Sequence, residues 1–233
     1  MPLRLTRRIP LEGVVKRIDH LAANPEGQQL FIAALGNNSL EVVDLKGGKR
    51  VRSLTGLQEP QGLAFVPELK RLFAANAASG DCELFDTGSM QRLQRVKLGE
   101  DADNVRYEAV AKQIYVGYGA GALAILDAKR GEKLGEIKLA GHPESFQLEK
   151  TGSRIFVNVP TAGHIAVADR LRRIVPATWP LEGAESNFPM GFDEAGHRLF
   201  IGCRKPAMLL IYDTSTGREI GRFPIGGDTD DLF

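Results

Sequence analysis

The sequence is poor in cysteine and in aromatic residues, and it has no long apolar run. Two cysteines occur in 233 residues, and 7% of the residues are aromatic. Two cysteines cannot form the disulfide framework of a small secreted domain, so a hydrophobic core must hold the fold together. No stretch of 18 apolar residues occurs, and we therefore expect no membrane span. The first ten residues lack the apolar core of a signal peptide, as expected of a cytoplasmic protein or of a processed chain.

A surplus of one charge is absent as well. Thirty Lys and Arg residues balance 29 Asp and Glu residues, which leaves a net charge of +1. This balance gives no reason to expect a nucleic-acid partner. The chain also lacks a P-loop, a C-x-x-C pair, an H-E-x-x-H motif and a G-x-G-x-x-G followed by a helix. Their absence disfavours nucleotide and zinc chemistry.

What the chain does contain is a repeated unit, seen most clearly from Gln113 to Glu149. Four short runs alternate between apolar and polar residues, and turns rich in glycine, proline and aspartate separate the runs. This pattern predicts a β-meander of four strands. We expect each strand to be too polar on one face to be buried on both sides.

Five copies of the unit align on a pair of apolar residues near the start of a strand. Successive pairs lie 42, 42, 41 and 44 residues apart. This period is typical of propeller blades with four antiparallel strands, whereas solenoid repeats of this length need a helical periodicity that is absent. The sequence therefore predicts an all-β fold, a β-propeller of four-stranded antiparallel blades. The pairs are Leu30-Phe31, Leu72-Phe73, Ile114-Tyr115, Ile155-Phe156 and Leu199-Phe200.

Both ends of the chain look like parts of a blade. Residues 8–13 match residues 179–183 in sequence, so we expect residues 1–13 to form an outer strand that closes a ring. Residues 16–227 would then hold five complete blades, and residues 228–233 would begin another. We expect one propeller domain over residues 1–233, as a fragment of a longer propeller. Its unpaired strand edges are expected to make the chain associate or precipitate.

Three of the repeated strands resemble a known family. Residues 113–117, 154–158 and 198–202, each followed by a turn and an apolar run ending in aspartate, are similar to the YVTN-type repeats of YncE-like bacterial β-propellers. That family belongs to the WD40/YVTN repeat-like group that includes the quinoprotein amine dehydrogenase heavy chain. The resemblance implies about seven blades, a periplasmic or secreted location, and a binding or scaffolding role without catalytic residues. A cytoplasmic location stays open.

One aspartate recurs in every unit at the end of the second strand, counted from the strand that carries the apolar pair. Because it is present in all five copies, we interpret it as a structural residue. Its side chain is expected to accept hydrogen bonds from backbone N–H groups of the turn that follows. The five residues are Asp44, Asp86, Asp127, Asp169 and Asp213.

The position eleven residues before each apolar pair is polar in four of the five units and differs between them. In a propeller it precedes the innermost strand, so these residues are expected to meet at one mouth of the channel and to bind a ligand there. The position is held by Asp19, Gln61, Asp103, Glu144 and Phe188, and matching residues 226–230 to 99–103 adds Asp230. Adjacent positions add His20, Asn104, Ser145, Asn187 and Asp231.

Four carboxylates in this set predict a cation site. Like charges near one axis repel one another unless a cation binds or one group takes a proton, and calcium prefers such oxygen ligands. The candidate ligands are Asp19, Asp103, Glu144 and Asp230. The alternative is a set of solvated polar loops with water in the channel.

Other residues suggest chemistry less strongly. Asp19 and His20 could form an acid–base pair, but neighbours in a strand point to opposite faces. His142, Glu144 and Ser145 have the residue types of a hydrolase triad without the G-x-S-x-G context. Both cysteines, Cys82 and Cys203, fall at core positions of the repeat, and Trp179 falls on an outer strand, where we expect it to pack between blades.

The leading functional hypothesis is a non-catalytic binding or scaffold propeller with a polar, acidic channel mouth. Its occupant would be a small ligand, a cation or a partner protein. One alternative is a calcium-dependent, lactonase-like hydrolase, which rests on the acidic set alone. A second is a subunit of a quinoprotein-type dehydrogenase, which rests on the family resemblance alone.

Overall fold

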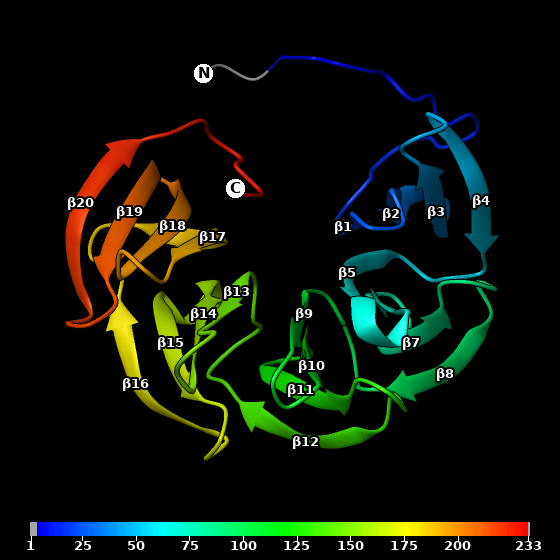
Figure 1. The fold of residues 1–233 in the computed structure, drawn as a ribbon. Coiled ribbons are helices and arrows are strands. Elements are labelled where there is room, and N and C mark those ends of the chain that lie inside the picture. Colours follow the sequence, from blue (N-terminus) through cyan, green and yellow to red (C-terminus); the bar gives the residue numbers. More distant parts are fainter. Residues whose placement is uncertain (1–3, 233) are drawn as a thin grey trace. The chain divides into compact units, whose positions relative to one another are not determined.

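The protein is built almost entirely from short antiparallel strands. The computed structural model describes residues 4–232, and these contain twenty strands in five four-stranded sheets (Figure 1). We call the sheets blades 1 to 5 in chain order. The predicted all-β class, the β-propeller fold and the four-stranded blades are confirmed. No helix among the described residues is long and apolar enough to cross a membrane.

Each blade takes four strands that follow one another in sequence. Blade 1 has β1 (Leu21–Asn24), β2 (Gln29–Ala34), β3 (Ser39–Asp44) and β4 (Lys49–Thr55). Blade 2 has β5 (Pro60–Val66), β6 (Arg71–Asn76), β7 (Asp81–Asp86) and β8 (Arg92–Lys97). Blade 3 has β9 (Val105–Glu108), β10 (Gln113–Tyr118), β11 (Ala122–Asp127) and β12 (Lys133–Lys138). Blade 4 has β13 (Phe146–Leu148), β14 (Arg154–Val159), β15 (His164–Asp169) and β16 (Ile174–Pro180). Blade 5 has β17 (Glu185–Asp193), β18 (Arg198–Lys205), β19 (Ala207–Asp213) and β20 (Arg218–Pro224).

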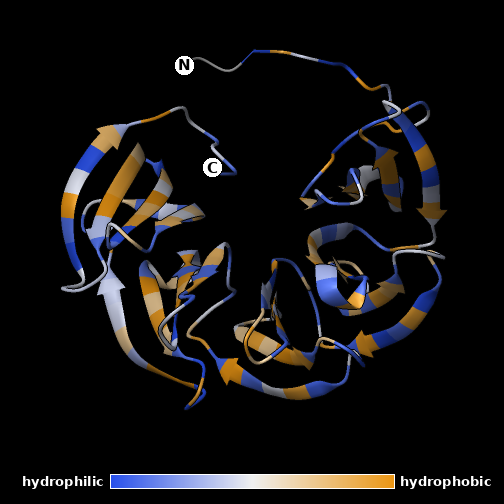
Figure 2. Ribbon diagram, in the orientation of Figure 1, coloured by the Kyte–Doolittle hydropathy of each residue, from blue (hydrophilic) through white to orange (hydrophobic). Residues whose placement is uncertain are grey.

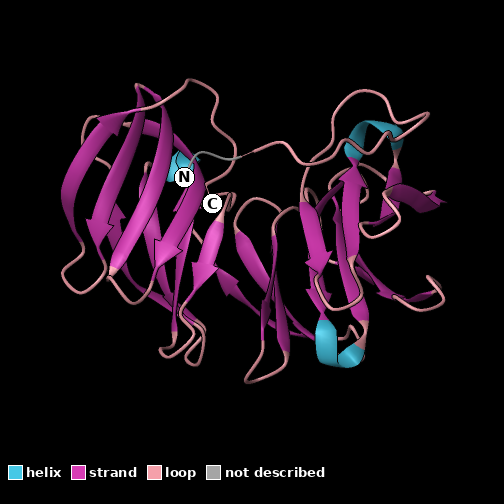
Figure 3. Ribbon diagram, turned by 45° about the horizontal axis from the view of Figure 1, so that its top comes forward, coloured by secondary structure: helices cyan, strands magenta, loops and turns pink. Residues whose placement is uncertain are grey.

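Single turns of 3-10 helix occur in loops between strands. They are η1 (Leu35–Asn37), η2 (Pro67–Leu69) and η3 (Pro160–Ala162) (Figure 3). The chain divides into two compact units, which we describe separately. Unit one comprises residues 1–107 and 127–132, and unit two comprises residues 108–126 and 133–233. Blades 1 and 2 lie in unit one, blades 4 and 5 lie in unit two, and blade 3 takes residues from both.

The strands of a blade differ in how they are buried. Hydrophobic and hydrophilic residues are interspersed along the fourth strands β4, β8 and β12 (Figure 2). In each of β10 and β11, by contrast, five of the six residues are buried, so both faces of these strands are covered. The expectation that every strand would be too polar to be buried on both sides was therefore wrong. In blades 2 and 3 the second and third strands are almost fully buried, whereas the fourth strands β4, β8 and β20 are mostly exposed.

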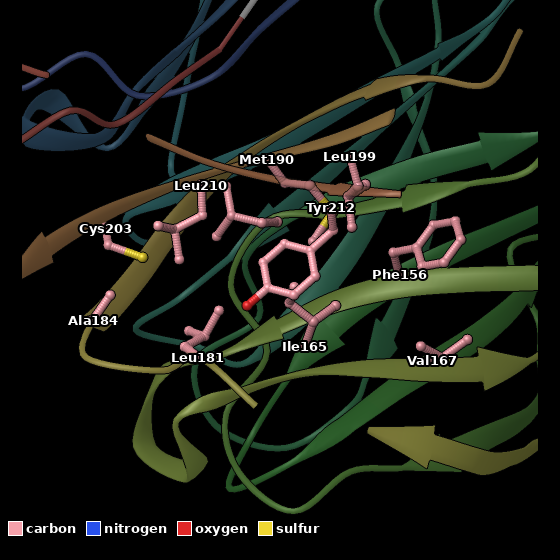
Figure 4. Packing of buried hydrophobic residues seen from close by; sticks show 11 residues of the cluster. Phe156, Ile165, Val167, Leu181, Ala184, Met190, Leu199, Cys203, Leu210 and Tyr212 are labelled. Atoms are coloured by element: carbon pink, nitrogen blue, oxygen red, sulfur yellow. The ribbon is translucent and has the colours of Figure 1, made fainter. Parts of the chain in front are cut away.

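Apolar contacts between successive blades form the core. In unit two, Phe156 and Ile165 of blade 4 pack with Met190, Leu199 and Tyr212 of blade 5 (Figure 4). In unit one, Phe31 and Leu40 of blade 1 cluster in the same way with Leu63, Leu72 and Phe85 of blade 2. Burying such a side chain stabilises the fold by about 1.5–3 kcal/mol. Blades are thus held together face to face.

Trp179 and the two cysteines lie at the positions predicted from the repeat. Trp179 on β16 stacks on Tyr212 of blade 5, with ring centroids 6.1 Å apart and an interplanar angle of 7°. Its predicted packing between blades is confirmed. Cys82 and Cys203 are free thiols and are buried, as predicted for core positions. Burial raises the pKa of Cys203 to about 11.

The repeated aspartate closes the turn after each third strand. In Asp213, Oδ1 accepts hydrogen bonds from the backbone N–H groups of Ser215 (3.0 Å) and Thr216 (2.8 Å). The equivalent pair of backbone donors is present at all five positions. Hydrogen bonding to the ionised form lowers the pKa of Asp213, chiefly through the Thr216 N–H. The predicted structural role is confirmed.

The two end segments contain no strand among the described residues. Residues 4–20 run along blade 1, where Arg7 Nη1 donates to the carbonyl oxygens of Leu45 (2.9 Å) and Lys46 (3.2 Å). Residues 225–232 follow β20 without strand structure. The closing strand over 1–13 and the further blade from 228 stay predictions, and their residues 1–3 and 233 lie outside the described part.

Gly62 on β5 provides a test of how tightly the first strands pack. A Cβ atom at Gly62 would lie 2.1 Å from the carbonyl oxygen of Asp103 and 2.9 Å from the nitrogen of Val105. Because backbone cannot move aside as a side chain can, we expect Gly62→Ala to destabilise the protein by about 1–3 kcal/mol. Gly226→Ala is the control, since nothing lies within 4 Å of its Cβ position. Equal urea midpoints for the two variants would contradict this prediction.

Candidate functional site

The start of blade 1 is an extended segment that is attached to β2 but precedes β1. The Asp19 N–H donates to the carbonyl oxygen of Ala33 (2.9 Å), and the Ala33 N–H donates to the carbonyl oxygen of His20 (3.0 Å). Strand β1 begins only at Leu21. The segment is therefore held in place without following the regular alternation of a strand.

Asp19 and His20 form a direct pair. Asp19 Oδ1 lies 2.7 Å from His20 Nδ1, and Asp19 Oδ2 lies 2.9 Å from Arg17 Nη2. The expectation that the two side chains would point to opposite faces was wrong, because they precede the strand to which that rule applies. The Asp19 side chain is 7% exposed and that of His20 is 22% exposed. The contact with Asp19 is made through Nδ1, on one side of the imidazole ring.

The charge of His20 is set by several neighbours in unit one. Burial alone would lower the pKa of His20. The hydrogen bond to Asp19 and the charges of Asp103 and Asp19 outweigh burial, although the positive charge of Arg106 opposes them. The pKa of His20 is therefore raised above its ordinary value. Folding therefore favours the protonated imidazole, whose two ring nitrogens are both hydrogen-bond donors.

The remaining predicted residues of unit one differ in accessibility. Asp103 and Asn104 are buried, with 7% and 3% exposed, and precede β9. The Asn104 Oδ1 atom is buried and has no hydrogen-bond donor among residues 4–232. Gln61 is partly exposed at the start of β5, next to Gly62. Unit one thus brings together Asp19 and His20, with Asp103 acting through its charge.

In unit two, Glu144 and Ser145 are attached to β14 as Asp19 and His20 are attached to β2. The Glu144 N–H donates to the carbonyl oxygen of Asn158 (3.0 Å), and the Asn158 N–H donates to that of Ser145 (3.1 Å). His142 Nδ1 lies 2.7 Å from the carbonyl oxygen of Gly119. This backbone contact gives His142 a structural role.

Asn187 belongs to a buried amide network. Its Nδ2 donates to Asn158 Oδ1 (2.9 Å) and to the carbonyl oxygen of His164 (3.2 Å). Asn158 Nδ2 donates in turn to the carbonyl oxygens of Phe188 (3.0 Å) and Pro189 (3.2 Å). The network lies at the irregular register of β17 between Asn187 and Met190. Asn187 is 0% exposed, so its observed contacts hold the strand in shape.

The predicted aspartates near residue 230 contact an arginine. Arg204 Nη2 forms ion pairs with Asp230 and with Asp228, the latter at 3.3 Å. The Arg204 guanidinium also lies 4.0 Å from the centre of the Phe188 ring, a cation–π contact. Asp231 is exposed. The acidic group that the sequence indicated is thus balanced locally by a cation.

Sequence reasoning missed three arginines near the predicted residues. Arg17 was detectable, because residues two apart in an extended chain share a face and Arg17 precedes Asp19 by two. Arg106 lies two residues beyond Asn104 and had the same signal. Arg204 approaches Asp230 from a different strand, so no spacing in the sequence indicates the pair.

The predicted calcium ligands are divided between the units. Asp19 and Asp103 belong to unit one, and Glu144 and Asp230 belong to unit two. No group of three or more His, Cys, Asp or Glu side chains within residues 4–232 is arranged to hold a metal ion. The calcium site stays a prediction.

The raised pKa of His20 makes a testable prediction about pH. A group whose pKa is raised by folding stabilises the protein below its unfolded pKa and loses that effect as the pH rises through the folded value. We therefore expect the urea midpoint of wild type to exceed that of His20→Asn at pH 5.5, and the gap to narrow by pH 8.5. A difference in urea midpoint between wild type and His20→Asn that widens as the pH rises would contradict the raised pKa of His20.

Comparisons with known proteins identify the fold. No family model and no curated protein matches the chain. Among solved structures, a chain of Kuenenia stuttgartiensis hydrazine synthase is similar, with a TM-score of 0.68 and 17% sequence identity. The match covers 95% of this chain and 92% of that chain. An identity this low shows the fold alone, and fold does not imply function. The structural match supports the β-propeller fold. The resemblance to YVTN-type repeats stays a prediction from the sequence.

Proposed function

We propose that this chain is a non-catalytic binding β-propeller whose ligand contacts lie at the starts of the first strands. The observation that carries the proposal is the Asp19–His20 pair. Asp19, itself paired with Arg17, orients the imidazole through Nδ1, and we assign Nε2 to the ligand. Convergent polar groups on a rigid scaffold are typical of ligand sites.

Comparison between blades supports a binding role for these residues. The turn aspartates are the same in every blade and close the same turn. At the positions of Asp19 and His20, blade 2 has Gln61 and Gly62, and blade 4 has Glu144 and Ser145. The backbone attachment is nevertheless the same in blades 1 and 4. The fold therefore keeps the same backbone attachment in blades 1 and 4 while the side chains differ.

The chemistry of the pair indicates what the ligand should offer. A protonated His20 donates a hydrogen bond through Nε2, so the ligand should present an acceptor such as a carbonyl or carboxylate oxygen. Asp103 adds negative charge that favours a donor or cationic group nearby. A small ligand or a segment of a partner protein carries both. The resemblance to YncE-like propellers supports a binding role and a periplasmic or secreted location.

A second candidate function follows from the same contact. An aspartate that orients a histidine is an arrangement used in general base catalysis. This would suit the lactonase-like hydrolase, although the raised pKa of His20 favours the protonated form over the base. Hydrolysis of a lactone panel with and without EDTA tests this alternative. Activity lost in His20→Asn would replace the binding proposal by a catalytic one.

A thermal-shift screen tests the binding proposal. The probes are calcium chloride, small carboxylates and amino acids, each raised to millimolar concentration. A ligand present at 100 times its dissociation constant adds about 2.7 kcal/mol to stability, which raises Tm by roughly 5–10 °C in a chain of this size. We expect the shift to disappear in His20→Asn and in Asp103→Asn, and to persist in Asp231→Asn. Shifts that survive in all three variants would place the site elsewhere.

A further inference from the structure

Each blade has two apolar faces, and successive blades join unlike faces. We define the forward face of blade 1 by Phe31, Leu40 and Val42, and its back face by Leu21 and Ile32. Equivalent residues define the faces of the other blades. In unit one the forward face of blade 1 packs on the back face of blade 2. In unit two the forward face of blade 4 packs on the back face of blade 5.

The back face of blade 1 is more exposed than its counterparts. Leu21, nine residues before the apolar pair of its blade, is 50% exposed. The residues at the same position in the other blades are all buried: Leu63 is 6% exposed, Val105 1%, Phe146 0% and Met190 2%. The repeat therefore places an apolar side chain at a contact position that lacks its usual cover.

The forward face of blade 5 is also more exposed than the equivalent faces of other blades. Phe223 on β20 lies opposite Leu209 and is 55% exposed. The equivalent residue of blade 3, Ile137 opposite Leu123, is 0% exposed. Phe200, Leu209 and Ile211 on this face are only partly buried, whereas Phe31, Leu40 and Val42 at the same positions of blade 1 are buried.

A buried ion pair on the back face of blade 1 is compatible with a blade-to-blade contact. Glu41 is 1% exposed and accepts hydrogen bonds from Ser39 (2.6 Å), Ser53 (2.8 Å) and Arg50 (3.1 Å). Blade 2 carries the equivalent pair, in which Arg92 lies 3.1 Å from Glu83. That pair lies on the same face as Phe85, which packs against blade 1.

The charges beside the two exposed faces have opposite signs. Residues 4–17, bound to blade 1 through Arg7 and through Arg17, contain five basic residues and one acidic residue. Residues 226–232 contain three aspartates and no basic residue. Leu232 of this acidic segment lies against Gly191 on the forward face of blade 5, with its Cβ 3.4 Å from the position of a Cβ at Gly191. Opposite charges at a contact steer association and select the partner.

We propose that the forward face of blade 5 binds the back face of blade 1 of a second copy of this chain. The contact repeats the joint between successive blades inside each unit and brings the acidic segment of one copy to the basic segment of the other. It is heterologous, so each copy keeps one face free after the first contact. Such a contact builds chains or closed rings of copies and does not stop at a symmetric dimer.

Two variants, each blocking one face, test the proposal by light scattering. Phe223→Glu introduces a charge on the forward face of blade 5, and Leu21→Glu introduces one on the back face of blade 1. Both side chains are half exposed, so both variants should fold, and circular dichroism checks this. We expect the mass of wild type to rise with concentration beyond that of a dimer. Each variant alone should stay monomeric, because one of its two complementary faces is blocked.

An equimolar mixture of the two variants gives the decisive result. The intact blade 1 of Phe223→Glu can meet the intact blade 5 of Leu21→Glu, so the mixture should form a dimer and stop there. Leu171→Glu, at an exposed turn of blade 4 that belongs to neither face, should associate as wild type does. Raising the salt concentration should reduce association by screening the charged segments.

Three results would overturn the proposal. These are a wild type that is monomeric at every concentration, a mixture that stays monomeric, and variants that each associate alone. If either Glu variant fails to fold, Phe223→Gln and Leu21→Gln replace the pair. These milder changes should raise the concentration needed for association by about tenfold. This corresponds to a loss of about 1.4 kcal/mol of binding free energy.

Discussion

The structure depends on one constraint: successive blades must cover each other's apolar faces. Phe156 of blade 4 contacts Trp179 at 5.3 Å and Phe192 of blade 5 at 5.3 Å between ring centroids. Trp179 in turn stacks on Tyr212. These rings tie β14 and β16 of one blade to the first and third strands of the next. The ring also packs tightly on Gly217 of blade 5, where a Cβ would lie 2.5 Å from Trp179 Nε1.

The same constraint separates the residues of the fold from those of the candidate site. Face-to-face packing fixes the second and third strands, and the turn aspartates fix the loops between third and fourth strands. The segment before each first strand is held by two backbone hydrogen bonds, seen at Asp19 with His20 and at Glu144 with Ser145. The side chains at these positions differ between blades 1 and 4, although the backbone attachment is the same. A binding function can therefore change from blade to blade without loss of the fold.

Much of the fold was predictable because the same strand and turn pattern occurs five times in the sequence. The period indicated four-stranded blades, the recurring aspartate indicated a turn, and the position of Trp179 indicated packing between blades. Each of these depends on local sequence or on a spacing that is the same in all units. The burial of second and third strands on both faces was not predicted, because alternation along the fourth strands was taken to hold for all strands.

The candidate site was predictable only in part. The positions of Asp19 and His20 followed from the spacing, but their contact did not, because it depends on β1 beginning at Leu21. The pair between Arg204 and Asp230 joins β18 to the segment after β20, and no spacing in the sequence indicates it. Asn187 was expected to meet a ligand, whereas the structure buries it in a network with Asn158. Polar residue types alone do not distinguish a ligand contact from an amide that holds a bulge.

The central claim is that a blade keeps its sheet only while its faces are covered by neighbours. The single tryptophan of the chain lies at the contact between blades 4 and 5 and reports on it directly. The most direct measurement follows Trp179 fluorescence and far-UV circular dichroism through the same urea titration. The account predicts coincident midpoints, because separating the blades removes the cover on which the strands depend. Strand signal that persists after Trp179 is exposed to water would show that blades are stable alone and would contradict the account.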